Sequence, residues 1–147
     1  MAYTDRELLA RLIQCEAGGE GENGMKAVAS VVMNRVNAVG GEYARISQGG
    51  SIQRIIFQPG QFVCAWESEG GVYNPQNIYN MSPTSEHFEI ADWAMEGNRL
   101  PDLDQALLFY NHYSPNCRGN FPSKVGYLQI RIGDHCFYNP TDAYYQT

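Results

Sequence analysis

Hydrophobic residues near the start of the chain recur with the period of an α-helix between residues 8 and 13. Residues 4–7, Thr-Asp-Arg-Glu, have the form of a capping box before this stretch, and the pair Gly18-Gly19 is expected to end the helix. On a helical wheel, Glu16 falls about 80° from Leu8, close to the middle of the hydrophobic stripe. The pattern therefore places a carboxyl group on the face that should be buried.

The position of Glu16 has two interpretations. A buried carboxylate loses hydration, so either a partner reaches it from elsewhere in the fold or its pKa rises and it stays partly protonated. Alternatively, the last turn of the helix reaches solvent, where a glutamate is ordinary. The first interpretation makes Glu16 a candidate proton donor.

The same periodicity predicts two further helices. One runs from about residue 25 to Val36, with Asn23 as its cap. Its hydrophobic stripe leaves Asn34 and Arg35 at ordinary solvent positions. The other begins at Ser82-Pro83 and ends near residue 97.

Between these helices the pattern is weaker. Residues 37–51 are rich in glycine and small side chains and are expected to form a surface loop. Residues 51–56 form a short apolar element, expected to be about one helical turn.

Beyond residue 105 the period changes to that of β-strands. Residues 106–110 are expected to form a buried strand, and residues 127–132 and 135–138 a hairpin around the turn Gly133-Asp134. N-terminal helices followed by a small antiparallel β-sheet predict an α+β fold. A length of 147 residues fits a single domain covering residues 1–147.

Composition and charge exclude some classes of binding partner. The net charge is −6 and the 10 lysines and arginines are scattered, so no basic patch supports binding to nucleic acid or anionic lipid. No apolar run is long enough to span a membrane. The N-terminus lacks the form of a signal peptide, so synthesis in the cytoplasm without such a signal is expected.

No paired spacing of the kind that zinc sites use occurs among the four cysteines, Cys15, Cys64, Cys117 and Cys136. We therefore expect neither a metal nor another cofactor, although His112 and His135 lie near two of the cysteines in sequence. Cys15 is interpreted as a small core residue, and the sequence leaves open whether any two cysteines form a disulfide.

Aromatic residues make up 12% of the chain, and many lie in its loop-like middle and its later strands. Such rings stack on the apolar faces of sugars, whose hydroxyl groups need amide partners. The rings and amides in question include Phe62, Trp66, Tyr73, Tyr79, Tyr110, Gln58 and Asn111. For any single ring, a place in the core is the alternative interpretation.

Three stretches carry a specific combination of residues: Glu16-Ala17-x-x-Glu20, residues 24–36 with Asn34-Arg35, and residues 56–62, Ile-Phe-Gln-Pro-Gly-Gln-Phe. This combination resembles the SleB/CwlJ family of bacterial cell wall hydrolases, which degrade spore cortex peptidoglycan during germination. The likeness covers nearly the whole chain, and the ending at residues 135–140 is more similar to the CwlJ branch.

The resemblance implies a lysozyme-like catalytic domain whose catalytic acid, the first glutamate of the Glu-Ala motif, corresponds to Glu16. The candidate substrate-binding residues are Glu20, Gln58, Phe62, Tyr110, Asn111 and His135. The expected substrate is the glycan strand of peptidoglycan, cut between muramic acid and N-acetylglucosamine. A spore coat or localisation protein is a further expected partner, with deposition in the spore coat or at the cortex. The segment 109–115 departs from the family pattern by being longer.

The number of carboxylates predicts the reaction. A glycoside hydrolase of the usual kind needs two, and no second acid is as well placed as Glu16, since Glu67, Glu69 and Glu86 have the pattern of solvated surface residues. A lytic transglycosylase needs only one carboxyl group, which protonates the glycosidic oxygen and then takes a proton from the muramoyl 6-hydroxyl. The resemblance favours the same reaction.

Two alternatives stay open. One is a Cys/His peptidase or amidase acting on the peptide stems, with Cys64 as nucleophile and His112 or His135 as base. The other is a non-catalytic wall-binding module, for which the aromatic residues would suffice.

Overall fold

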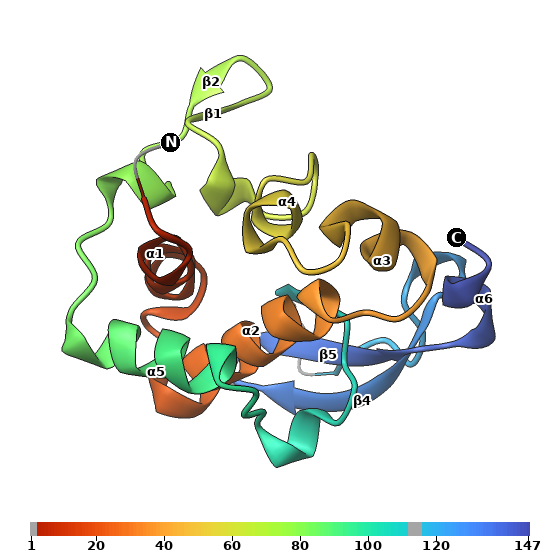
Figure 1. Cartoon of the computed structure of the whole chain (residues 1–147). Coiled ribbons are helices and arrows are strands. Elements are labelled where there is room, and N and C mark those ends of the chain that lie inside the picture. Colours follow the sequence, from red (N-terminus) through yellow and green to blue (C-terminus); the bar gives the residue numbers. More distant parts are fainter. Residues whose placement is uncertain (1–2, 112–115) are drawn as a thin grey trace.

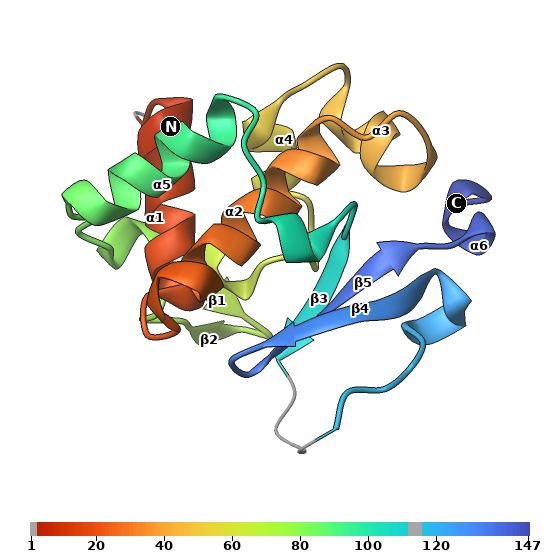
Figure 2. The ribbon, with the colours of Figure 1, turned by 90° about the horizontal axis from the view of Figure 1, so that it is seen from below.

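The structure, a computed structural model, describes residues 3–111 and 116–147. Most helices come before a three-stranded antiparallel sheet, and one short helix follows it, which confirms the α+β prediction. Figures 1 and 2 show the helices on one side and the sheet on the other, with α2 (Gly21–Val36) between them.

The α-helices of the described residues are α1 (Asp5–Ala17), α2, α3 (Gly41–Ser47), α4 (Ile52–Ile56), α5 (Ser85–Met95) and α6 (Asp142–Tyr145). Short 3-10 helices connect them: η1 (Val63–Ala65), η2 (Ile78–Asn80), η3 (Pro101–Leu103) and η4 (Pro122–Lys124). The strands β1 (Ser68–Glu69) and β2 (Val72–Tyr73) pair as a small ribbon. The main sheet has the order β3-β5-β4, with bounds Leu108–Asn111, His135–Pro140 and Gly126–Ile132.

The predicted ends of α1 are confirmed. The Thr4 hydroxyl accepts a hydrogen bond from the Glu7 backbone N–H at 3.2 Å, and Gly18 follows the last helical residue. The apolar residues between 8 and 13 are fully buried against α2 and α5, so the helical stripe faces the core as the period indicates.

Two sequence predictions about the following segments are wrong. Helix α2 begins at Gly21, not near residue 25, so Asn23 lies inside the helix. Gly21 has a φ of +79°, which glycine adopts readily, and this lets the chain turn into α2 early.

The loop predicted for residues 37–51 contains α3 instead. The buried ring of Tyr43 stacks on Tyr144 at 5.8 Å, and the Tyr144 hydroxyl donates to the Gly40 carbonyl at 2.8 Å. A residue about one hundred positions away therefore stabilises this short helix, which no local pattern indicates.

The hairpin and the third helix follow the prediction closely. β4 and β5 join through the Gly133-Asp134 turn, where Gly133 has a φ of +57°. β5 is the central strand, and its first five residues are buried. Helix α5 begins at Ser85, slightly later than predicted, because Thr84 and His87 form a capping box.

None of the helices in the described ranges is long and apolar enough to cross a membrane.

The tightest glycine in the sheet gives a stability prediction. A Cβ atom at Gly126 would lie 2.8 Å from Leu108 Cδ1 and 2.9 Å from Tyr138 Cβ. Gly126→Ala should therefore lower the free energy of unfolding, measured by urea denaturation, by about 1–3 kcal/mol. Gly119→Ala is the control, because no atom lies within 4 Å of a Cβ there. Equal losses in the two variants would contradict this packing argument.

Candidate active site

A cleft of about 530 Å³ lies where the helices meet the sheet. Its wall takes residues from α1, α2, α3, β3 and β5, so it joins segments far apart in sequence. The side chains on this wall include Glu16, Arg35, Glu42, Phe62, Tyr110, Asn111 and His135.

Glu16, in the last turn of α1, is half-buried in this cleft. Burial raises its pKa from 4.5 to about 7, while the positive charge of Arg35 and a hydrogen bond from the Cys64 backbone N–H oppose the rise. Near neutral pH the carboxyl group is therefore divided between its acid and its carboxylate forms. The interpretation of Glu16 as a buried carboxyl with a raised pKa agrees with this geometry.

The prediction that Arg35 points to solvent is wrong, since its side chain is only 3% exposed. Its Nε donates to the Leu107 carbonyl at 2.7 Å, and its guanidinium lies over the ring of Tyr43 at 4.5 Å and that of Phe62 at 5.1 Å. These contacts compensate for lost hydration. Burial lowers the pKa of Arg35, but a guanidinium in a protein stays charged, so a cation remains near Glu16.

The prediction that Asn34 lies at an ordinary solvent position is also wrong. Its Nδ2 donates to the Ala106 carbonyl at 3.0 Å, and its Oδ1 accepts from Arg99 Nε at 2.8 Å. The segment leading into β3 covers this side of α2, so what looks like a solvent face from the helix alone becomes an interface.

Sequence reasoning missed Glu42, the second carboxylate of the cleft. It lies in the first turn of α3, within the segment predicted to be a loop, and the sequence contains no signal that would bring it to the cleft. Gln58 is buried and does not line the cleft, but its Nε2 donates to Glu42 Oε1 at 3.0 Å. Gln58 thus holds the side chain of Glu42, which lines the cleft, from behind.

Glu20, like Gln58, lies outside the cleft wall. Its Oε1 is 3.4 Å from both the Nδ1 of His135 and the backbone N–H of Asp134. His135 is 4% exposed and lines the cleft. Burial lowers the pKa of His135, although Glu20 and Asp134 oppose this, so the ring is neutral near pH 7. Glu20 therefore lies beside His135 on the side away from the cleft wall, at a distance too long for a good hydrogen bond to the ring.

Phe62, Tyr110, Asn111 and His135 are the predicted residues that the structure brings together with Glu16. Tyr110 stacks on Tyr138 at 5.7 Å, and its hydroxyl accepts from the Arg118 N–H at 3.3 Å. Asn111 is exposed at the end of β3, opposite His135 in the sheet register. The cleft thus combines rings, an amide and two carboxylates, a set suited to a sugar chain.

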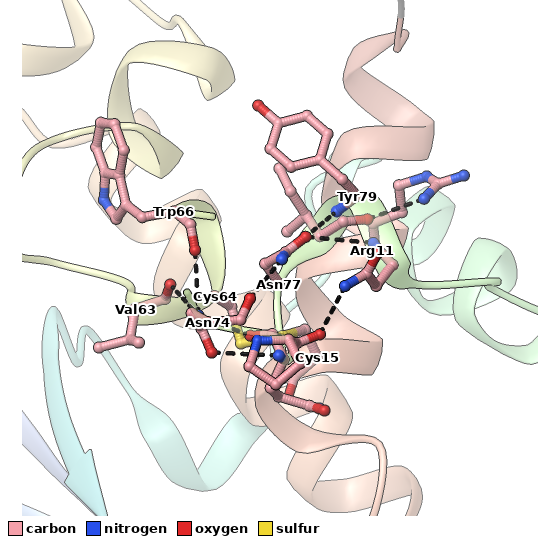
Figure 3. Close-up of a disulfide and its surroundings, with 12 residues drawn as sticks. Arg11, Cys15, Val63, Cys64, Trp66, Asn74, Asn77 and Tyr79 are labelled. Carbon is pink, nitrogen blue, oxygen red and sulfur yellow. Dashed lines mark hydrogen bonds between the residues drawn. A yellow bond between two sulfur atoms is a disulfide. The ribbon is translucent and has the colours of Figure 1, made fainter. Parts of the chain in front are cut away.

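Two disulfides, Cys15–Cys64 and Cys117–Cys136, use all four cysteines. The first joins the neighbour of Glu16 to η1, and Asn74 Nδ2 donates to the carbonyls of Val63 and Trp66, both at 3.1 Å (Figure 3). The Cys64 N–H that faces Glu16 is therefore held from two sides.

The disulfides argue against the Cys/His peptidase or amidase alternative. With its sulfur bonded to Cys15, Cys64 has no thiol to act as a nucleophile. Of the two candidate bases, His112 lies outside the described residues and His135 lines the cleft. Within residues 3–111 and 116–147, no three His, Cys, Asp or Glu side chains gather in a way that would hold a metal ion.

A family model described as Cell Wall Hydrolase matches residues 19–138. The chain belongs to the Cell Wall Hydrolase family. It is 31% identical to the cell wall hydrolase CwlJ of Halalkalibacterium halodurans, over 95% of this chain and 87% of the relative. It is 29% identical to CwlJ of Bacillus subtilis, over 93% and 86%. The predicted SleB/CwlJ resemblance is thereby confirmed, and the protein is a cell wall hydrolase.

Solved structures agree on the fold of this cell wall hydrolase. The catalytic domain of the germination-specific lytic transglycosylase SleB from Bacillus anthracis superposes with a TM-score of 0.65, at 22% identity, over 94% of this chain and 98% of that one. The SleB catalytic domain of Bacillus cereus gives a TM-score of 0.62. The lysozyme-like fold prediction is confirmed. The family model begins three residues after Glu16 and does not include it. The role of Glu16 is therefore argued from the geometry of the cleft.

The raised pKa of Glu16 predicts a pH-dependent cost to stability. Because this pKa is about 7 in the fold and ordinarily 4.5, the unfolded chain releases the proton first, and stability falls as pH rises between these values. Glu16→Gln has no such proton. Its melting temperature should exceed that of the wild type by a margin that grows between about pH 4.5 and 7 and is constant above. A margin that does not vary with pH would contradict the assigned pKa.

The Cys15–Cys64 disulfide beside Glu16 leads to a prediction about the pKa of Glu16. Replacing Cys15 and Cys64 together by alanine frees η1 and weakens the hydrogen bond from the Cys64 N–H, so the pKa of Glu16 should rise above about 7. Carboxyl-carbon NMR titration measures this, with the signal identified by its loss in Glu16→Gln. The matched control replaces Cys117 and Cys136, and it should leave this pKa unchanged. The same shift in both variants would indicate general loosening instead.

Proposed function

We propose that this cell wall hydrolase cleaves the glycan strands of spore cortex peptidoglycan between muramic acid and N-acetylglucosamine, as a lytic transglycosylase with Glu16 as general acid and base. The observation that carries the proposal is a half-buried carboxyl with a pKa of about 7 in a cleft beside a buried arginine. Such a group can both give and take a proton near neutral pH. The SleB of similar fold is itself named a germination-specific lytic transglycosylase.

In the first step Glu16 protonates the glycosidic oxygen, and the bond from that oxygen to the anomeric carbon breaks. The carboxylate that remains is stabilised by the charge of Arg35 and by the Cys64 N–H, both of which lower the pKa of this group. Burial therefore keeps the proton on Glu16 before the step, while Arg35 and the Cys64 N–H lower the free energy of the carboxylate that the step leaves.

In the second step the Glu16 carboxylate removes the proton from the 6-hydroxyl of the muramoyl unit, and the freed oxygen bonds to the anomeric carbon. The product is a 1,6-anhydro sugar, and Glu16 is protonated again for the next cycle. No water is consumed, and one carboxyl group serves both steps.

Glu42 supports a second candidate reaction. A hydrolase needs a second carboxylate as nucleophile or as the base that activates water. Glu42 lines the same cleft, and the hydrogen bond from Gln58 holds it in place. The transglycosylase reaction remains our proposal because Glu16 has the pKa that both of its steps require.

We further propose that the enzyme acts during germination and resides in the spore coat or at the cortex, where a coat protein positions it. The support is the likeness to CwlJ proteins over most of the chain. The net charge of −6 fits a substrate that carries few negative charges.

Product analysis and two variants test the mechanism. Glu16→Gln should keep its fold and lose cortex-lytic activity by at least about 100-fold, because general acid catalysis contributes about 10²–10⁴. Mass spectrometry of fragments released by the wild type should find 1,6-anhydromuramic ends, lighter by one water than the hydrolytic product. Glu42→Gln should retain the same products.

Other outcomes separate the alternatives. Reducing ends as the main product, together with loss of activity in Glu42→Gln, would replace the proposal by two-carboxylate hydrolysis. Cleaved peptide stems with intact glycan would reject both reactions.

A further inference from the structure

We infer that Trp66 and the surface around it form an additional sugar-binding subsite, which holds the glycan strand where it leaves the cleft of Glu16. This inference rests on the proposed function and extends it to a surface that the chemical step does not use. Trp66 lies directly after η1, the short helix tied to α1 by the Cys15–Cys64 disulfide.

The surface at Trp66 continues the wall of the cleft. A hollow of about 140 Å³ lies between Trp66 and the cleft, and Gly60, Phe62 and Val63 line both. On the other side of Trp66, a second hollow of about 280 Å³ lies against Phe57 and Tyr79. A polymer that occupies the cleft can therefore follow this wall past Trp66 without leaving a lined surface.

The same surface exposes several apolar side chains. Three of the large hydrophobic side chains that the described residues expose, Val63, Trp66 and Tyr79, line the two hollows. The Trp66 side chain is 37% exposed and Tyr79 is 38% exposed. Exposed apolar patches of this kind mark binding surfaces, and flat rings stack on the apolar faces of sugars.

The backbone that carries Trp66 is fixed in advance. Asn74 Nδ2 donates to the Trp66 carbonyl and to the Val63 carbonyl, as Figure 3 shows beside the disulfide. The edge of one ring meets the face of the other where Trp66 contacts Phe57, at 6.2 Å between centroids and an interplanar angle of 76°. A ring held in this way loses little conformational entropy when a sugar binds.

The polar groups at the rim favour a carbohydrate over other partners. Ser68 and Glu69 line the hollow nearest the cleft, and Glu67 lines the other. Hydroxyl and carboxylate oxygens accept hydrogen bonds from sugar hydroxyl and acetamido N–H groups. The two glutamates disfavour nucleic acid or acidic lipid, and continuity with the cleft favours the substrate itself over a docked protein.

The test compares peptide-free glycan strands of two lengths, tetrasaccharides and long chains, as substrates. Trp66→Ala should raise KM for long chains about tenfold, the loss expected for one stacking contact, with kcat within about twofold. We expect a tetrasaccharide bound for cleavage to stay within the cleft, so its KM should not change. Trp66→Phe, which keeps a ring, should restore most of the affinity.

Tyr127→Ala is the matched control, because Tyr127 is an exposed aromatic residue on β4 that lines neither hollow nor the cleft. Its KM should stay at the wild-type value for both lengths. Melting temperatures establish that each variant is folded.

A binding measurement separates this inference from the proposed function. The chain has two tryptophans, Trp66 and Trp93, so Trp93→Phe with Glu16→Gln leaves Trp66 as the only fluorescent indole in a protein expected to be inactive. Long glycan chains should shift its emission, and tetrasaccharides should not. This readout needs no turnover, so it holds whether or not Glu16 is the acid.

Three results would overturn the inference. Trp66→Ala could leave KM unchanged for both lengths, in which case the ring binds no sugar. It could lower kcat equally for both lengths, which would make Trp66 a positioning residue for the Glu16 segment. Normal kinetics on glycan combined with loss of the enzyme from spores would identify the surface as a protein-docking site.

Discussion

For the proposed role as general acid and base, the carboxyl group of Glu16 has to be buried enough to keep a proton near neutral pH, yet it must still reach substrate and tolerate becoming ionised. Burial alone would make the carboxylate too costly. The structure balances this cost with one buried cation, Arg35, and one backbone N–H from Cys64, both of which lower the pKa that burial raises. Much of the surrounding architecture supplies these two groups.

A buried arginine is itself expensive, so its surroundings are constrained in turn. Arg35 donates to the Leu107 carbonyl ahead of β3 and to the Gln61 side-chain oxygen at 3.4 Å, and its guanidinium lies over the rings of Tyr43 and Phe62. These contacts join α2, α3, the segment after α4 and the sheet at one point. The Cys64 N–H is fixed in a similar way, by a disulfide to the neighbour of Glu16 and by Asn74. The interactions that pack these segments together are thus the same ones that position Arg35 and the Cys64 N–H near Glu16.

Several parts of this arrangement follow from local sequence. The limits of α1, the hairpin turn at Gly133 and the α+β order depend on caps, glycine conformations and periodicity, all of which act over a few residues. The place of Glu16 on a hydrophobic helical stripe is local as well. Family motifs then connected this residue with cell wall chemistry, and the family match confirms that class of protein. The strand predicted for residues 106–110 also agrees with β3 to within two residues.

Other features were decided only by tertiary structure. Arg35 and Asn34 look solvent-exposed on an isolated helix, because the segment that covers them comes about seventy residues later. Glu42 reaches the cleft because Tyr43 packs on Tyr144, a contact that spans 101 residues and creates a helix where the composition indicates a loop. The cysteine pairing likewise depends on which chain segments meet in space. The sequence by itself determined the helix that carries Glu16 and the family of the protein. The raised pKa of Glu16, the buried cation near it and the second carboxylate of the cleft required the fold, since burial and charge proximity are properties of contacts between distant segments.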